Sequence, residues 1–346
     1  MLNKIKKSIN AELAVFIQDL GSKYRLKAIC PPLHDHIVNY INRPGKLIRP
    51  TLCALGYLAY AKKPAKRLYR SALSMELLHN FLLIHDDIID KAALRRGKPS
   101  MHTMFAQYLE KMPEAKFSGS DLAIVAADII YALSVDTFMA IRENPIRKEN
   151  ALKKFTEAAY LTGCGEFVEM LAGAKSIDSV RKKDIDAIYD LKTAHYTFAS
   201  PLTIGALLAG AKPAQIELLT NYGMLVGRAF QIHDDLLDIF GTEQQIGKPP
   251  LTDVREAKKT LLVWYAYKHL PEKKKKLMQR IYDSGKPAMS DLLTVRSLIT
   301  ESGSADYAKR TIRSLVNSAA RICGKLSVKP AYKEFLRRFP STFISI

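Results

Sequence analysis

The sequence predicts an all-α protein, and three observations lead to this fold class. Apolar residues recur at helical spacing in long segments, strand-like alternation bounded by turn residues is hard to find, and proline and glycine gather at the segment ends. The 346 residues are 48% hydrophobic and 25% charged, which is ordinary for a globular protein with a large core. Because no internal repeat and no long biased linker stand out, we expect residues 1–346 to form one helical bundle domain.

The expected helices follow one another along the chain. They cover residues 3–20, 47–62, 67–90, 121–141, 149–172, 182–195, 200–208, 213–238 and 259–283. The main breaks are PGK at 44–46, RGKP at 96–99, the KMPEAKFSGS segment, ENP at 143–145 and GKPP at 247–250. The first segment is basic, but Glu12 and Asp19 interrupt its apolar pattern, so it predicts an amphipathic helix and not a signal peptide.

Hydropathy and cysteine usage favour a cytoplasmic protein. Asp128 interrupts the longest apolar stretch, at 121–134, so no transmembrane span is expected. The four cysteines are scattered and form no CxxC pair, which is typical of free thiols in a reducing compartment. They are Cys30, Cys53, Cys164 and Cys323.

The formal net charge of +19 indicates an anionic partner, which could be nucleic acid, an anionic membrane surface or an anionic substrate. Basic runs at 147–154 and 273–276 alternate with helix formers and are most simply solvated helix faces. The sequence has no zinc-finger spacing and no recognisable DNA-reading helix, so nucleic acid is the weaker alternative. Contact of the basic surface with a membrane stays open.

Two aspartate motifs stand out, HDDIID at 85–90 and HDDLLD at 233–238. Each reads Asp-Asp-x-x-Asp, and on a helix the first and last of these residues lie about one turn apart on the same face. A single motif of this kind is more often a solvated face. Here apolar residues flank both motifs, which makes uncompensated carboxylates costly and bound cations favourable. The pair therefore predicts a polyanion bridged by hard cations such as Mg²⁺.

Cationic residues that could bind the rest of such a polyanion occur in four places. They are Lys46 and Arg49 in PGKLIRP, Arg95 and Arg96 in LRRGKPS, Lys192 in KTAHYTF, and Lys248 and Lys258 after the second motif. A guanidinium offers a planar fork to phosphate oxygens and an ammonium offers a movable point charge. This mixture fits two diphosphates better than two carboxylates.

The ordered motifs resemble those of trans-isoprenyl diphosphate synthases. GKxxRP, LLHxxxLIHDDxxD followed by RRG, KTxxYTF, and FQxxDDxLD followed by GKP and KKT cover roughly residues 45–262, and YTF with the context of the first motif is similar to archaeal geranylgeranyl diphosphate synthases. The resemblance implies an all-α bundle with a deep central cavity, usually a homodimer. It would condense isopentenyl diphosphate with dimethylallyl, geranyl or farnesyl diphosphate, most plausibly to a twenty-carbon product. A farnesyl or C25 diphosphate synthase is the alternative.

The resemblance also implies a role for each candidate residue. Asp86, Asp90 and Asp234 would hold about three Mg²⁺ ions, with Mn²⁺ as an alternative metal, and Asp87, Asp235 and Asp238 would bind metal waters or support the ligands. Arg95, Lys192, Lys248 and Lys258 would bind the allylic diphosphate, and Lys46, Arg49, His79 and Arg96 that of isopentenyl diphosphate. Thr193 and Gln231 would face the allylic cation with their oxygens.

Product length is expected to depend on two residues before the first motif. Phe81 lies five residues before Asp86 and Leu82 lies four before it. A single aromatic at this place resembles geranylgeranyl diphosphate synthases, whereas two adjacent aromatics are typical of farnesyl synthases. We therefore expect Phe81 to block the cavity behind the first motif.

Some positions depart from the family pattern, and two rival functions stay open. PGKLIRP lacks the usual doubled glycine, Ala127 and Glu169 replace a usual Gly and Asp, and Leu251 and Ala257 stand where Gly is common. The last two are expected to reshape the loop after the second motif. A class I terpene cyclase and a non-catalytic partner subunit are the rivals, and the two complete aspartate motifs argue against both.

Overall fold

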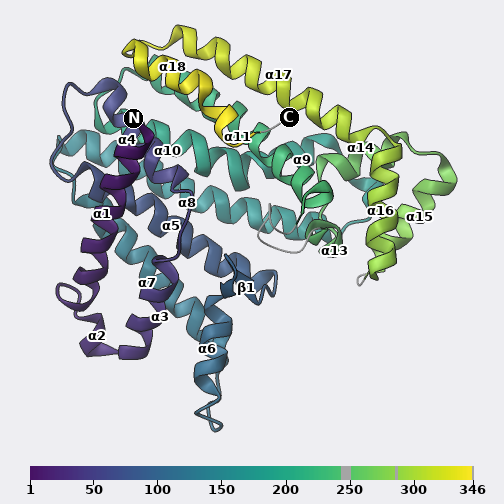
Figure 1. The fold of residues 1–346 in the computed structure, drawn as a ribbon, viewed down its shortest axis with the longest axis horizontal. Coiled ribbons are helices and arrows are strands. Elements are labelled where there is room, and N and C mark those ends of the chain that lie inside the picture. Colours follow the sequence, from purple (N-terminus) through teal and green to yellow (C-terminus); the bar gives the residue numbers. More distant parts are fainter. Residues whose placement is uncertain (243–250, 285–286, 345–346) are drawn as a thin grey trace. The chain divides into compact units, whose positions relative to one another are not determined.

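The computed structural model describes residues 1–242, 251–284 and 287–344. Most of these residues are helical and very few are in strands, which confirms the predicted all-α class (Figure 1). The chain divides into two compact units. Unit 1 comprises Met1–Leu152 and Ile204–Gly210, and unit 2 comprises Lys153–Thr203 and Ala211–Ile346. Each unit is described by itself below, and the expectation of a single domain stays a prediction.

Unit 1 is built on helices of the N-terminal half and one short hairpin. Its elements are α1 (Leu2–Gly21), α2 (Leu26–Ile29), α3 (Pro31–Ile41), α4 (Ile48–Tyr60), α5 (Leu68–Ile89), β1 (Leu94–Arg95), β2 (Lys98–Pro99), α6 (Met101–Leu109), α7 (Gly119–Met139) and the start of α8 (Pro145–Gly173).

Helix α5 is the centre of unit 1 and ends in the first aspartate motif. It packs against α7, α4 and α1, and most of its residues from Leu68 to Leu78 are buried on every side of the helix. The antiparallel hairpin of β1 and β2 follows directly, and its turn residues Arg96 and Gly97 both have positive φ. A two-residue turn of this kind matches the twist of the paired strands. Arg95 lies on the first strand of this hairpin, beside the end of α5, where it bonds to Asp87.

Unit 2 holds the second aspartate motif. Its elements are the rest of α8, η1 (Ile177–Ser179), α9 (Lys182–Tyr189), the π-helix η2 (Asp190–Ala199), the start of α10 (Ser200–Leu208), whose residues from Ile204 on belong to unit 1, α11 (Pro213–Phe240), α13 (Thr252–Arg255), α14 (Leu261–His269), α15 (Glu272–Asp283), α16 (Met289–Glu301), α17 (Ser304–Lys325), α18 (Pro330–Arg338) and η3 (Phe339–Thr342).

Helix α11 is the centre of unit 2 and packs against α17 and η2. Two glycines of α11 allow η2 to come close. A Cβ at Gly223 would lie 2.4 Å from the Cα of Ala199, and one at Gly227 would lie 2.3 Å from the Cα of Ala194. Because these contacts admit no side chain, they hold the segment that carries Lys192 and Thr193 tightly against the helix that carries the second motif.

Three expectations about the helices differ from the structure. Residues 190–199 form a π-helix that joins α9 to α10, where the periodicity predicted an α-helix ending at 195. The helix predicted for 259–283 is two helices, because Pro271 cannot continue α14 and precedes α15. Seven α-helices of the described residues were not predicted, namely α2, α3, α6, α13, α16, α17 and α18.

Helix α7 bears on the question of a membrane span. It runs without a break through Asp128, and its length and composition would allow it to cross a membrane, with a mean hydropathy of 1.8 in its most apolar window. A core helix of a soluble protein meets the same test, and α7 packs against α5 and α6 within unit 1. The expected absence of a span therefore stays a prediction.

Candidate active site

The first aspartate motif occupies the last turn of α5 in unit 1. Asp86 keeps 23% of its side chain exposed, whereas Asp87 has none exposed. Asp90 ends the helix as its C-cap residue and is partly buried. The motif therefore offers Asp86 and Asp90, one turn apart, at the accessible end of the helix.

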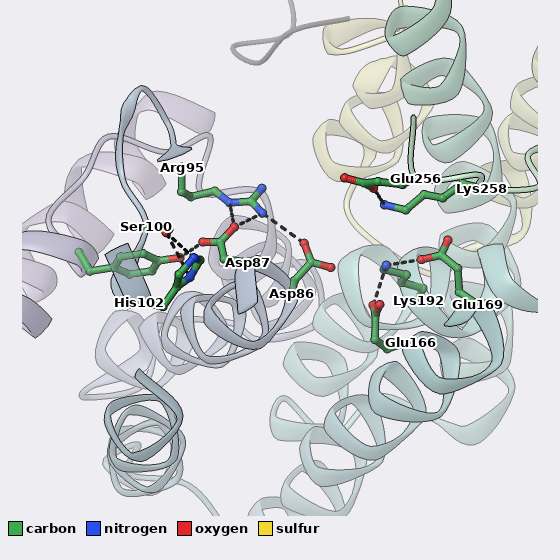
Figure 2. Close-up of polar contacts among 11 residues, drawn as sticks. Asp86, Asp87, Arg95, Ser100, His102, Glu166, Glu169, Lys192, Glu256 and Lys258 are labelled. Atoms are coloured by element: carbon green, nitrogen blue, oxygen red, sulfur yellow. Dashed lines mark hydrogen bonds and ion pairs between the residues drawn. The ribbon is translucent and has the colours of Figure 1, made fainter. Parts of the chain in front are cut away.

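Asp87 is anchored inside unit 1 by two side chains. Its Oδ2 accepts a hydrogen bond from the Tyr40 hydroxyl at 3.1 Å, and its Oδ1 accepts one from Arg95 Nε at 2.7 Å. Arg95 also bonds to Asp86 Oδ2 at 3.2 Å, as Figure 2 shows. Burial raises the pKa of Asp87, and the neighbouring Arg95 opposes that shift. The guanidinium thus links the first two carboxylates of the motif.

A second group of cations surrounds Glu76 and His79 on α5. Arg96 donates to Glu76 Oε1 at 3.5 Å and to the Arg43 carbonyl at 3.2 Å. The pKa of His79 lies well below its ordinary value, first because of burial and then because of Arg49, Arg96 and Arg95. His79 is therefore neutral, and the structure gathers His79, Arg49 and Arg96, three of the four residues predicted to bind the second diphosphate. The fourth, Lys46, is exposed and follows Gly45, against which the Arg96 guanidinium lies.

Phe81 lies on α5 and is packed by two aromatic rings. Its ring centroid is 5.0 Å from that of Tyr131 on α7 and 4.9 Å from that of His85, with the latter pair edge to face. Leu82 beside it is partly buried. The side chain of Phe81 is therefore held in place between α5 and α7, and its role in product length stays a prediction.

The second aspartate motif occupies the last third of α11 in unit 2, and its three carboxylates differ in exposure. Asp234 is exposed, whereas Asp235 and Asp238 are 2% and 3% exposed. Asp238 Oδ2 accepts a hydrogen bond from the Asp253 backbone N–H at 3.1 Å, and its backbone carbonyl accepts one from Leu251 N–H at 2.8 Å. Asp238 thereby anchors the start of α13 to the end of α11.

The described part of the segment after the second motif, from residue 251 on, contains two residues with positive φ. Leu251 has φ 63° and Ala257 has φ 55°. Glycine adopts this conformation without strain, whereas a Cβ makes it unfavourable. At both positions the motif resemblance led us to expect glycine, so the residues present add backbone strain at both ends of α13.

Asp235 is the middle of a hydrogen-bonded chain that runs through unit 2. Its Oδ1 accepts from Gln231 Nε2 at 2.9 Å, and Gln231 Oε1 accepts from the Thr193 hydroxyl at 2.6 Å. Its Oδ2 accepts a short hydrogen bond from Tyr189, whose oxygen in turn accepts from the Leu261 N–H at 2.8 Å. Burial raises the pKa of Asp235 well above its usual range. The structure thus brings Gln231 and Thr193 together, and their role at an allylic cation stays a prediction.

Lys192 lies between two glutamates of α8, as Figure 2 shows. Its ammonium is 2.6 Å from Glu166 Oε2 and forms a short ion pair with Glu169. A Cβ at Gly165 would lie 2.8 Å from the Lys192 backbone nitrogen, so glycine allows α8 and η2 to approach here. Two carboxylates therefore hold one of the predicted diphosphate ligands.

The side chains of Lys258 and Lys259 have different partners. Lys258 pairs with Glu256 Oε2 at 2.7 Å (Figure 2). Lys259 is buried, donates to the Gly173 carbonyl at 2.5 Å and lies over the ring of Tyr282. Of these two, Lys258 is the one that fits a ligand role. Lys248, the remaining predicted diphosphate ligand, lies outside the described residues.

Sequence reasoning missed the tyrosines that hold the middle aspartates. Tyr40 lies on α3 and Tyr189 at the end of α9, far from the motifs in sequence, so no local pattern could have revealed them. It also missed Glu76 and Glu166. Glu166 had a usable signal, because it lies three residues before Glu169 and therefore on the same side of the helix.

A family model described as polyprenyl synthetase matches residues 31–299, well over half of the chain. The chain therefore belongs to the polyprenyl synthetase family and is a prenyltransferase, which confirms the resemblance drawn from the motifs.

Named relatives place the chain more closely within this family. It is 28% identical over 336 residues to the geranylgeranyl diphosphate synthase of Sulfolobus acidocaldarius, covering 95% of this chain and 96% of that protein. It is 34% identical over 307 residues to the geranylfarnesyl diphosphate synthase of Aeropyrum pernix, covering 86% of this chain and 89% of that protein.

A solved structure shares the fold. It is that of a geranylgeranyl pyrophosphate synthase from Corynebacterium glutamicum, complexed with isoprenyl diphosphate and magnesium. The TM-score is 0.90 at 24% identity, covering 100% of this chain and 99% of that chain. The predicted all-α isoprenoid synthase fold is thus confirmed.

Proposed function

We propose that the protein is a Mg²⁺-dependent prenyltransferase that joins isopentenyl diphosphate to an allylic diphosphate and yields the twenty-carbon geranylgeranyl diphosphate. The allylic substrate would be dimethylallyl, geranyl or farnesyl diphosphate. The observation that carries this proposal is that the first and the middle aspartate of each motif have different surroundings. The first residue, Asp86 or Asp234, reaches solvent, whereas the middle one, Asp87 or Asp235, is buried and held by a tyrosine.

The donor set fits Mg²⁺. This ion prefers oxygen ligands and is usually bound through one or two carboxylates together with substrate phosphates. Asp86, Asp90 and Asp234 would hold about three such ions, with Mn²⁺ as an alternative, while Asp87, Asp235 and Asp238 support the ligands. When bound, Mg²⁺ would neutralise the leaving diphosphate and make ionisation of the allylic C–O bond accessible.

The cationic residues would form two groups, one for each diphosphate. Arg95, Lys192, Lys248 and Lys258 would bind the allylic diphosphate. Lys46, Arg49, Arg96 and neutral His79 would bind that of isopentenyl diphosphate. The acceptor diphosphate must stay on its carbon while the other leaves, so a site built from protein cations and His79 is suited to hold it.

Ionisation produces an allylic cation, which needs oxygen dipoles and protection from water. The oxygens of Thr193 and Gln231 supply the dipoles in this proposal. The double bond of isopentenyl diphosphate attacks the cation, a new carbon–carbon bond forms, and the departing diphosphate accepts the proton that is lost. No nucleophilic residue of the protein is required.

Chain length is the finer part of the proposal. Phe81, held between α5 and α7 by Tyr131, would limit the growing tail. A C25 product is the alternative. The observation behind it is the 34% identity to a protein named geranylfarnesyl diphosphate synthase.

We also propose a cytoplasmic homodimer. An apolar stripe on α8 supports the dimer, because Tyr160, Phe167, Met170 and Leu171 are each more than half exposed. The four cysteines of the described chain are all free, which suits a reducing compartment. The proposed dimer is tested by measuring the molar masses of the wild type and of Phe167→Glu by light scattering. The wild type is expected to be a dimer and the variant a monomer, whereas two dimers would exclude this face of α8.

The experiment that tests the function is a product analysis. Purified protein is incubated with isopentenyl diphosphate, Mg²⁺ and each allylic primer in turn, and the dephosphorylated products are separated by chain length. A dominant C20 alcohol that disappears with a chelator is the expected result. A dominant C25 alcohol would support the alternative, a cyclic hydrocarbon would indicate a cyclase, and the absence of turnover would point to a partner subunit.

A further inference from the structure

Tyr189 connects three segments of unit 2 that carry proposed substrate-binding residues. It is the last residue of α9, so it directly precedes the π-helix with Lys192 and Thr193. Its hydroxyl donates to Asp235 on α11 and accepts from the N–H of Leu261, the first residue of α14. Lys258 lies three residues before that N–H. A single phenol therefore joins the segments of both lysines to the second aspartate motif.

The contacts of Asp235 suit an anchor. Both of its oxygens accept hydrogen bonds from protein donors, Oδ1 from Gln231 and Oδ2 from Tyr189, and the residue is 2% exposed. Its neighbour Asp234, by contrast, is exposed. Asp235 is thus turned into the interior of unit 2, where it can orient Gln231.

The orientation of Gln231 follows from this contact. An amide presents its N–H to a carboxylate, so Asp235 leaves Gln231 Oε1 to face Thr193. The Thr193 hydroxyl then donates its single hydrogen to Oε1 at 2.6 Å, and its own lone pairs remain for another partner. The chain from Tyr189 therefore decides which atoms of Gln231 and Thr193 are presented as acceptors.

We propose that Tyr189 is a positioning residue that acts through Asp235 to orient the oxygens of Gln231 and Thr193 toward the allylic cation. This inference rests on the proposed prenyltransferase function. It assigns Asp235 to the support of Gln231, and it leaves metal binding in the second motif to Asp234.

Tyr189→Phe tests the inference, because it removes the donor to Asp235 and the acceptor for Leu261 N–H while keeping the ring. The expected result is a fall in kcat of about 10- to 100-fold, the usual effect of losing a residue that orients a ligand. Since the oxygens act on charge that develops during ionisation, KM for both substrates is expected to stay within about threefold. The Mg²⁺ concentration for half-maximal rate should not move.

Two tyrosines of the same unit provide matched controls. Tyr282 is 6% exposed, close to the 5% of Tyr189, and its hydroxyl has no hydrogen-bond partner among the described residues, so Tyr282→Phe should keep the wild-type kcat. The Tyr222 hydroxyl donates to the Leu336 carbonyl at 2.6 Å inside unit 2. Tyr222→Phe should therefore lower the Tm and leave kcat unchanged. A kcat loss in Tyr222→Phe equal to that in Tyr189→Phe would show a general effect of destabilisation and overturn the inference.

A double-mutant comparison separates positioning from other effects. If Tyr189 acts through Gln231, Tyr189→Phe added to Gln231→Ala should reduce kcat little further than Gln231→Ala alone. Full additivity would contradict the inference. If Tyr189→Phe does not fold, Asp235→Asn breaks the same chain with an isosteric side chain and should lower kcat without raising the Mg²⁺ requirement.

The outcomes also distinguish this inference from the proposed function. A wild-type protein that forms no prenyl product would overturn both. An active wild type with an equally active Tyr189→Phe variant would overturn only the role of Tyr189.

Discussion

Asp87 and Asp235 occupy the same place in two nearly identical motifs, yet the fold compensates them differently. Both are buried and both accept a hydrogen bond from a tyrosine, Tyr40 or Tyr189. The remaining oxygen of Asp87 takes a guanidinium, whereas that of Asp235 takes a neutral amide. The middle aspartate of each motif is thus a buried anchor, but its second hydrogen-bond partner differs between the two motifs. Arg95 brings a positive charge to a proposed diphosphate site, and Gln231 brings an oxygen to a proposed cation site.

The largest expected effect distinguishes the first aspartates from the middle ones. Asp86→Asn and Asp234→Asn each remove an accessible carboxylate that is proposed to bind metal, so kcat/KM should fall by about 10³-fold or more. Steady-state rates at saturating Mg²⁺ check this. Asp306→Asn, at an exposed position of α17, should behave like wild type. Near-normal activity of Asp86→Asn or Asp234→Asn would remove that residue from the proposed metal site.

The second prediction contrasts the charged and the neutral partner in their effect on stability. Arg95→Gln leaves the buried carboxylate of Asp87 without its cation and should lower the free energy of unfolding by about 3 kcal/mol. Gln231→Ala removes a neutral hydrogen bond and should cost about 1 kcal/mol. Urea denaturation gives both values, and exposed Arg313→Gln serves as the control. Equal losses in the two variants would mean that the charge of Arg95 is not what compensates Asp87.

The third prediction concerns product length. Both residues proposed to limit it, Phe81 and Leu82, lie on α5, the helix that carries the first motif. Phe81→Ala removes the ring that packs against Tyr131, so the product should lengthen by about one five-carbon unit. Leu82→Ala, at the adjacent and partly buried position, should shift product length less. Chain-length analysis of the alcohols checks both variants. An unchanged product from Phe81→Ala would exclude that residue as the limit.

The smallest expected effect on stability comes from Asp136, an exposed carboxylate of unit 1. Its contribution can be compared with those of the buried Asp87 and Asp235. Asp136 accepts hydrogen bonds from Lys23 and Tyr24, which lower its pKa below the ordinary 3.8. A lowered pKa adds stability that is present above pH 3.8 and is lost as the pH falls through the folded-state value. Asp136→Asn should therefore cost less than about 1 kcal/mol at pH 7, because the pair is exposed. The difference from wild type should shrink below pH 3.8, and a difference that grows there would contradict the assignment.

The parts of the fold and site that could be predicted are those that depend on the spacing of residues close together in the sequence. The helices that end in the two motifs, α5 and α11, follow from apolar periodicity, and Thr193 and Gln231 were singled out by the motif resemblance, although their hydrogen bond to each other was not predicted. The π-helix could not be predicted, because no residue pattern in 190–199 marks it, and its close contacts with Gly223 and Gly227 of α11 are tertiary.

The partners of the middle aspartates could not be predicted either. Tyr40 and Tyr189 reach Asp87 and Asp235 only through the tertiary fold. The two motifs have nearly the same sequence, although their middle aspartates have different surroundings. Buried polar groups find partners wherever the fold supplies them, so the sequence shows the need for a partner and not its identity.

A Mg²⁺ titration of the turnover rate in wild type, Asp234→Asn and Asp235→Asn distinguishes a metal ligand from an anchor. We expect Asp234→Asn to need more Mg²⁺ for half-maximal rate, whereas Asp235→Asn should keep the wild-type requirement and lose kcat. An Asp235→Asn variant whose Mg²⁺ requirement rises as much as that of Asp234→Asn would contradict the assignment of the middle aspartate as an anchor.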